Sequence, residues 1–280
     1  MRDLESVRRS FLRKSGVYSG RSSWPFLSGD TFREMCEIRV DTKSDVEKIF
    51  SLEEYSGNIF VRAEVADYLI SELSSSRHLD FSNVNFVIHN GDHIPDKYEL
   101  VKFASQVKHV YCVNWLGSSP NISPIPIGLE NWSYLQNGVP KDFSNLVDLP
   151  RDINLLVGFS NYTNLVERSE ARAFAAEVSD VYFVPEGTSP RKYRELVRRS
   201  RFVLSPPGNG PDCHRTWESI YLGAIPIVKE EFWPFLNFQL PVLLVSQWSE
   251  IPSAVKKPII HPRINVVELG GLFTGGLLND

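Results

Sequence analysis

One stretch of the chain combines residue types that suit anion binding. Residues 205–228 read SPPGNGPDCHRTWESIYLGAIPIV, in which prolines and glycines precede an Asp-Cys-His-Arg cluster, an amphipathic run and a short apolar run. Glycine lets a backbone approach a ligand closely, and the free N–H groups of a first helical turn attract negative charge. The stretch is therefore a candidate phosphate cradle. An ordinary loop, helix and strand with solvated charges is the alternative.

The amphipathic run predicts a helix with two different faces. On a helical wheel, Trp217, Ile220 and Tyr221 fall on one side, and Arg215 and Glu218 fall together on the other. We expect the apolar side to pack on a sheet. Arg215 and Glu218 are then expected to face solvent or a cleft.

The start of this helix is predicted at Asp212, whose side chain would serve as the N-cap. Backbone N–H groups near Cys213 and His214 would then be open to an anion. His214 taken alone is more often a structural histidine.

A dinucleotide-binding loop is a second interpretation of the same glycines. Gly208 and Gly210 fit the start of the fingerprint, and Glu230 lies at a suitable distance to hold a ribose. Cys213 stands where the third glycine belongs, and Pro211 stiffens the turn. An NAD-type Rossmann enzyme is therefore the weaker alternative.

Apolar strands that alternate with helical segments position this loop. Such alternation predicts an α/β fold with parallel sheets, and ligands bind such sheets at the carboxyl ends of their strands. A linker-like segment at 136–152 divides the chain into two Rossmann-like lobes, 1–145 and 146–280, with a cleft between them. The expected strands are 58–62, 85–88, 110–113, 154–159, 181–184, 202–204 and 242–245, and the expected helices are 64–73, 98–105, 167–178 and 190–199.

Composition excludes several classes of protein. A net charge of -4 argues against non-specific nucleic-acid binding. Cys36, Cys112 and Cys213 are few and widely spaced, which favours a reducing, cytoplasmic setting. Residues 1–15 lack the apolar core of a signal peptide, and no run approaches the ~20 apolar residues of a spanning helix. Any membrane association is expected to be peripheral.

Several segments resemble exostosin-like glycosyltransferases of the family 47 type. The longest is SRFVLSPPGNGPDCHRTWESIYLGAIPIV, followed by LPVLLVSQWSEI at 240–251, FVIHNGD at 86–92, ISPIPIGLEN at 122–131 and GFSNYTNLVERSEAR at 158–172. The compact length resembles bacterial and large-virus members, among them a xylosyltransferase. Cys213 replaces a more usual Thr. The chain ends soon after the second lobe, which argues against the family's C-terminal helix that crosses back.

The resemblance implies an inverting glycosyltransferase of GT-B architecture. Such an enzyme moves a sugar from a nucleotide diphosphate donor to a hydroxyl of a glycan acceptor. The resemblance favours a UDP-sugar, with UDP-xylose as one candidate. No Asp-x-Asp motif is present, so no metal or other cofactor is expected. The expected donor-binding residues are Ser160, Arg168, Ser205, Pro207, Gly208, Asn209, Gly210, Asp212, His214, Arg215 and Glu218.

The attacking hydroxyl needs a general base, expected in the first lobe. The candidates are Asp30 in LSGDTF, and Asp92 and His89 in HNGD. HNGD also fits a plain turn, and Asp30 also fits an N-cap. A non-catalytic module that binds nucleotide or glycan remains a different class of hypothesis. Donor hydrolysis in the absence of acceptor separates the two.

Overall fold

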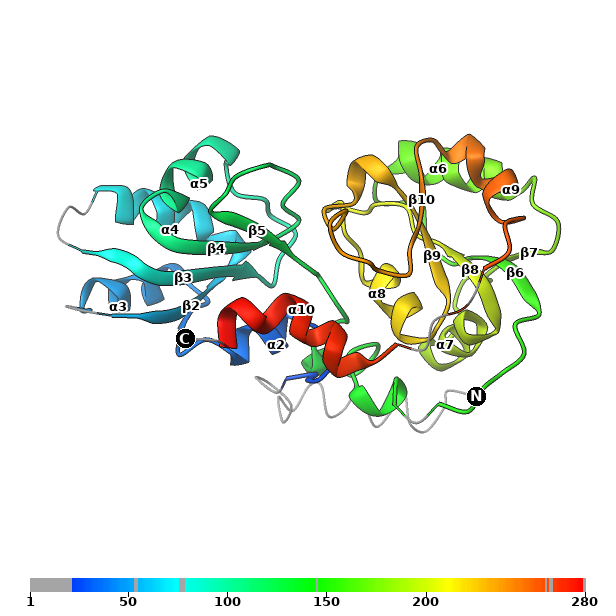
Figure 1. Cartoon of the computed structure of the whole chain (residues 1–280), viewed down its shortest axis with the longest axis horizontal. Coiled ribbons are helices and arrows are strands. Elements are labelled where there is room, and N and C mark those ends of the chain that lie inside the picture. The colour runs from blue at the N-terminus through cyan, green and yellow to red at the C-terminus, as the bar shows by residue number, and fades with distance from the viewer. Residues whose placement is uncertain are drawn as a thin grey trace.

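The computed structural model describes residues 22–52, 55–75, 79–144, 146–259, 261 and 264–278. The expectation about residues 1–15 lies outside this range. The described chain forms two five-stranded sheets, and every strand pairing within them is parallel (Figure 1). The predicted α/β class with parallel sheets is confirmed.

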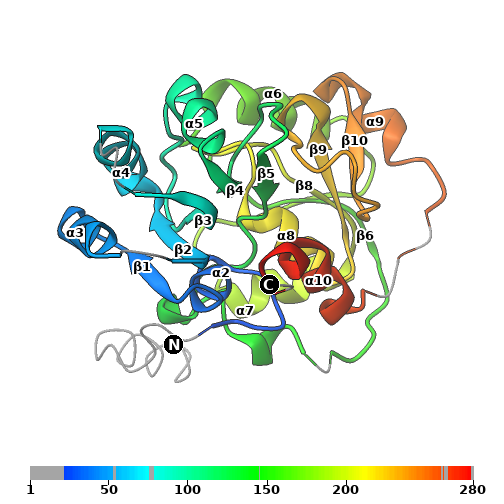
Figure 2. The ribbon, with the colours of Figure 1, turned by 60° about the vertical axis from the view of Figure 1, so that its left-hand side comes forward.

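The first sheet runs in chain order. Right-handed crossovers that always step in one direction place their helices on one face. Figure 2 shows α3, α4 and α5 together on that face. The other face is covered by α2 and α10, whose apolar side chains pack on the first sheet. The strands are β1 (Ile38–Val40), β2 (Gly57–Arg62), β3 (Phe81–His89), β4 (Val107–Val113) and β5 (Ile122–Ile125), and the helices are α2 (Gly29–Glu34), α3 (Val46–Phe50), α4 (Ala63–Ser75), α5 (Lys97–Ala104) and α10 (Val266–Leu278).

The second sheet has the order β7-β6-β8-β9-β10, so the direction of winding reverses between β6 and β8. Helices α6 and α9 cover one face of this sheet, and α7 and α8 cover the other. A reversal of this kind opens a crevice at the carboxyl ends of the two strands. The strands are β6 (Ile153–Val157), β7 (Val181–Phe183), β8 (Ser200–Leu204), β9 (Ile225–Lys229) and β10 (Leu243–Val245), and the helices are α6 (Leu165–Ala175), α7 (Pro190–Arg199), α8 (His214–Tyr221) and α9 (Ile251–Ala254).

A shared apolar core joins the two halves. Phe26 of the first half packs edge-to-face on Tyr221 of α8, with ring centroids 5.0 Å apart. Trp217 is fully buried and meets Phe273 of α10 at 5.7 Å. Aromatic contacts of this kind add to the burial of apolar area. The two sheets are therefore held together by side chains as well as by the connecting chain.

Helix α10 returns to the first sheet, contrary to the expectation from sequence. The Asn58 side chain on β2 donates a hydrogen bond of 2.9 Å to the Leu277 carbonyl. At Gly276 a Cβ would lie 2.2 Å from the Tyr111 hydroxyl, so glycine permits this close approach. The assignment of all of 146–280 to the second lobe therefore needs correction at its C-terminal end.

The segment predicted as a linker is held against the protein. Phe143 is buried, and Arg194 of α7 forms an ion pair of 2.9 Å with Asp142. Arg194 also donates to the Gln136 carbonyl at 3.0 Å.

Within the described residues, no helix has the length and apolar character needed to cross a membrane.

Candidate functional site

The carboxyl ends of the two sheets face one another. The loop after β8 meets the loops that follow β3 and β5 through side-chain hydrogen bonds. These join Asn209 Nδ2 to Asp92 Oδ2 at 2.9 Å, Ile127 N to Asp212 Oδ2 at 2.9 Å, and His214 Nδ1 to the Gly128 carbonyl at 2.8 Å. The predicted cradle therefore lies at the junction of the two halves.

Two arginines converge beside this loop. The guanidinium carbons of Arg168 and Arg215 lie 5.8 and 5.2 Å from the centre of the Phe159 ring. Arg168 is only 7% exposed, and it donates to the carbonyls of Pro207 (2.9 Å) and Ser160 (2.7 Å). Burial and the neighbouring charge of Arg215 both lower the pKa of Arg168. Among the described residues, neither arginine forms an ion pair with a carboxylate, although the charge of Arg215 reaches the Glu218 carboxyl.

The loop backbone lies directly against these cations. A Cβ at Gly208 would lie 2.9 Å from Arg168 Nη2, so a larger residue would crowd the guanidinium. Helix α8 begins at His214 with Cys213 as its N-cap, which corrects the predicted cap at Asp212. The N–H groups of His214 and Arg215 make no hydrogen bond to any described residue. Two open amides and two unpaired arginines together suit an anion.

Asp212 instead fixes the loop from inside the protein. Its carboxylate accepts hydrogen bonds from Trp217 Nε1 at 2.8 Å and from Ile127 N at 2.9 Å. Burial raises its pKa to about 7. Ser205 is also fully buried, and its hydroxyl bonds to Thr216 at 2.8 Å. These two predicted donor-binding residues shape the loop, and neither side chain faces open space.

Glu218 is buried, which excludes solvent as the surroundings expected for it and leaves the cleft as the other expectation. It is 5% exposed because both halves of the protein pack on α8. Burial and the nearby charge of Glu130 raise its pKa to about 7, while Arg215 and Arg194 oppose the shift. Near neutral pH this carboxyl is therefore close to half protonated.

A pocket of about 540 Å³ adjoins the arginines at the carboxyl ends of β6 and β7. Tyr162 stands at this pocket with 93% of its surface exposed. Aromatic faces, an arginine and a glutamate give it both apolar and polar contacts. The lining residues are Gly158, Phe159, Ser160, Asn161, Tyr162, Arg172, Val184, Pro185, Glu186, Gly187, Thr188 and Tyr193.

Sequence reasoning identified Ser160 alone among those lining residues. The loop after β6 reads GFSNYTN, and an exposed aromatic residue directly after a buried strand is a signal that predicts a ligand surface. Pro185 to Thr188 come from a different strand end. No sequence spacing relates those two loops, because their proximity depends on the pairing of β6 with β7.

Asp30 lies in the first turn of α2 on the first-half side of the junction. Ser28 caps this helix, so the alternative of Asp30 as the N-cap is wrong. Asp30 is 8% exposed, and its Oδ2 has no hydrogen-bond partner. Burial raises its pKa to about 6, against the opposing charge of Arg33. Hydrogen bonds from the Trp132 backbone and the Asn90 side chain also oppose the rise. A carboxylate with one open oxygen and a pKa near neutrality suits proton transfer.

His89 is poorly placed to accept a proton. Its Nδ1 accepts from the Asn90 N–H at 2.6 Å, and its Nε2 lies 2.9 Å from the Pro126 carbonyl, to which it donates. Burial lowers its pKa to about 4. Asp92, the third candidate, is exposed and bonds to Asn209 across the junction. Asp30 is therefore the base candidate with a buried carboxylate oxygen that has no hydrogen-bond partner.

Buried polar atoms without partners gather at the same edges of the two sheets. A buried polar group that lacks a hydrogen bond is uncommon and points to strain or function. Asn114, which follows β4, lacks partners on both amide atoms and lies against Gly210. Sequence reasoning missed it. The other residues with such atoms are Asp30, Trp115, Asn161 and Tyr193.

Within the described part of the chain, no three His, Cys, Asp or Glu side chains are grouped closely enough to hold a metal ion. No family model matches the chain, and no curated protein matches it. The function must therefore be argued from the site itself.

Proposed function

We propose that this protein is an inverting glycosyltransferase that takes a sugar from a nucleotide diphosphate donor. The observation that carries the proposal is the pair Arg168 and Arg215, two cations without carboxylate partners beside open N–H groups of α8. A diphosphate gains negative charge as it leaves the sugar. Fixed cations and amides that meet this charge stabilise the transition state.

The pocket beside Arg168 and Arg215 has the size for a nucleoside. Phe159, Tyr162 and Tyr193 offer aromatic surface to a base, and the diphosphate would extend toward the loop after β8. This arrangement is compatible with the GT-B architecture that we propose, in which the second half binds the donor. The resemblance to exostosin-like enzymes favours uridine as the nucleoside and a glycan as the acceptor.

Asp30 is the proposed base. It accepts the proton of the acceptor hydroxyl as the oxygen forms a bond to the anomeric carbon. The bond from that carbon to the diphosphate breaks on the opposite face, so the configuration inverts. A short series of contacts joins the two sides: Asn131 accepts from Asp30 N–H at 2.9 Å, Ser28 bridges to Gly128, and Gly128 accepts from His214.

The test is transfer with a panel of UDP- and GDP-sugars in the presence of a chelator. We expect one donor to be consumed and a glycoside of inverted configuration to form with a suitable acceptor. Asp30→Asn should lower the rate of this reaction by about 10²–10⁴ while nucleotide binding persists. If the protein binds nucleotide but neither transfers the sugar nor slowly hydrolyses the donor, the non-catalytic module is favoured instead.

A further inference from the structure

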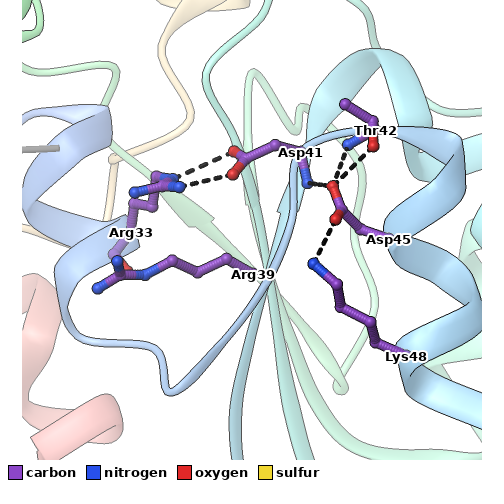
Figure 3. Close-up of polar contacts among 6 residues, drawn as sticks. All are labelled: Arg33, Arg39, Asp41, Thr42, Asp45 and Lys48. Atoms are coloured by element: carbon purple, nitrogen blue, oxygen red, sulfur yellow. Dashed lines mark hydrogen bonds and ion pairs between the residues drawn. The ribbon is translucent and has the colours of Figure 1, made fainter. Parts of the chain in front are cut away.

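A second carboxylate competes with Asp30 for the nearest cation. Arg33 follows Asp30 by three residues on α2, which places their side chains on the same face of the helix. Arg33 turns instead toward Asp41, directly after β1 (Figure 3). Its Nε and Nη2 meet the two carboxylate oxygens of Asp41 at 3.1 and 2.6 Å. This fork geometry is the strongest form of the arginine-carboxylate pair.

Asp41 is itself held in place by the next turn of the chain. The Asp45 carboxylate accepts from the N–H groups of Asp41 (3.2 Å) and Thr42 (2.8 Å), and Lys48 donates to its other oxygen at 2.5 Å (Figure 3). Arg39 donates to the carbonyl of Arg33 at 3.2 Å, which fixes the end of α2. The Arg33–Asp41 pair therefore joins two restrained segments.

The consequence for Asp30 is an open oxygen beside an occupied cation. Among the described residues, the charges that act on Asp30 are those of Arg33 on its own helix and Asp41 after β1, and the His89 ring lies against the neighbouring Gly29. His89 is neutral, because burial lowers its pKa to about 4. The charge of Arg33 lowers the pKa of Asp30, and the charge of Asp41 raises it. Asp41 therefore decides how strongly Arg33 acts on Asp30.

We propose that Asp41 is a positioning residue for the reaction: by binding Nε and Nη2 of Arg33, it keeps Oδ2 of Asp30 without a partner and able to take a proton from the acceptor hydroxyl. This inference rests on the proposed function, in which Asp30 is the base. Without Asp41, Arg33 is free to turn one helical step back and form a salt bridge with Asp30. A paired carboxylate is a weaker base.

The test compares Asp41→Asn with the double variant Asp41→Asn/Arg33→Gln. The titration of Asp30 is followed by carbon NMR of its carboxyl group, and kcat is measured against pH. In Asp41→Asn we expect the pKa of Asp30 to fall by about 1–3 units, because an adjacent guanidinium favours the charged form. The acid limb of the kcat profile should shift to lower pH by the same amount. The plateau value of kcat should fall, and KM should change little.

Removal of Arg33 as well should restore both the titration and the kcat. If Asp41 has only a structural role, kcat of the double variant should be lower than that of Asp41→Asn, because the loss of a second residue would destabilise the protein further. Lys48→Met is the matched control, because it removes an ion pair from the same cluster without touching Arg33. It should leave the titration of Asp30 unchanged.

Two results would overturn different statements. The role given to Asp41 is refuted, even if transfer is intact, if the pKa of Asp30 is the same in Asp41→Asn as in the wild type. It is also refuted if the double variant has no higher kcat than the single variant. Absence of transfer from every donor refutes the proposed function and the role of Asp30 as its base. The NMR titration still reports whether Asp41 controls Arg33 in that case.

Discussion

Replacement of Arg215 by Gln should weaken ligand binding without destabilising the fold. The guanidinium carbons of Arg168 and Arg215 lie within 5.8 and 5.2 Å of the same ring centre, so they are at most about 11 Å apart. At an effective dielectric constant of about 20, two unit charges at that distance repel by about 1.5 kcal/mol. The two guanidinium groups therefore repel each other, and the substitution removes that repulsion.

The interactions that Arg215 would lose are weak. Its Nε lies 3.4 Å from the Gly158 carbonyl, near the limit for a hydrogen bond, and its Nη1 lies 3.8 Å from Cys213 Sγ. Its other interactions are with the Phe159 ring, the Tyr193 hydroxyl and the charge of Glu218. We expect the Tm of Arg215→Gln to equal or exceed that of the wild type. Hydrogen bonds to charged groups contribute about 1.5–3 kcal/mol, so the Kd for a nucleoside diphosphate should rise by about 10- to 100-fold.

The assay pairs thermal unfolding with calorimetric titration of UDP and GDP. Arg201→Gln is the matched control, since Arg201 also lies over an aromatic ring in the second half but bonds to Asn154. That variant should keep the wild-type Kd. If Arg215→Gln binds both nucleotides as tightly as wild type, or if it unfolds at clearly lower temperature, Arg215 serves the fold and not an anion.

Three further predictions concern the acidic side chains. Asp30→Asn should lower kcat by about 10²–10⁴ with nucleotide affinity unchanged, as steady-state kinetics and titration will show. Asp92→Asn should keep kcat within about tenfold, because it loses one exposed hydrogen bond to Asn209; a loss as large as that of Asp30→Asn would make Asp92 the base. Glu218 has a folded pKa of about 7, above its ordinary value of 4.5, so ionisation destabilises the folded state as pH rises through that window. The free energy of unfolding of Glu218→Gln, measured in urea, should therefore match that of the wild type below pH 4.5 and exceed it by about 3 kcal/mol above pH 7. A difference between the two proteins that does not change with pH would contradict a buried carboxyl with a raised pKa.

Local patterns in the sequence predicted the elements well. The helix expected at 190–199 agrees with α7, because Ser189 and Pro190 mark its start by their side-chain chemistry. Buried parallel strands such as β3 read as apolar runs that end at turn residues. These signals depend on neighbouring residues, so one sequence is enough to reveal them.

The errors came from tertiary packing. Glu218 occupies the polar side of an isolated helical wheel, yet it is buried, and its carboxyl is near the charges of Glu130 and of Arg194 on α7. Asp212 has the side chain of an N-cap, but Trp217 and Ile127 take its oxygens. Helix α10 was not predicted, because it is stabilised by contacts with a sheet that is distant in the sequence.

The site was predicted in part for the same reason. The glycine loop and Arg215 belong to one continuous segment, whose chemistry can be read directly. The pocket combines loops after β6 and β7 with a residue of α7, and the pairing of Arg33 with Asp41 depends on where β1 ends. Such arrangements follow from strand order, which spacing along the chain does not encode.

Calorimetric titration of the wild-type protein with UDP and GDP, in the presence of a chelator, tests the central claim most directly. Arg168, Arg215 and the open amides of α8 predict saturable binding of at least one of the two. The corresponding nucleoside, which lacks the diphosphate, should bind at least tenfold more weakly, since each charge-assisted contact is worth more than 1.4 kcal/mol. Failure of both nucleotides to bind, or equal affinity for nucleotide and nucleoside, would contradict the assignment of this site to a diphosphate.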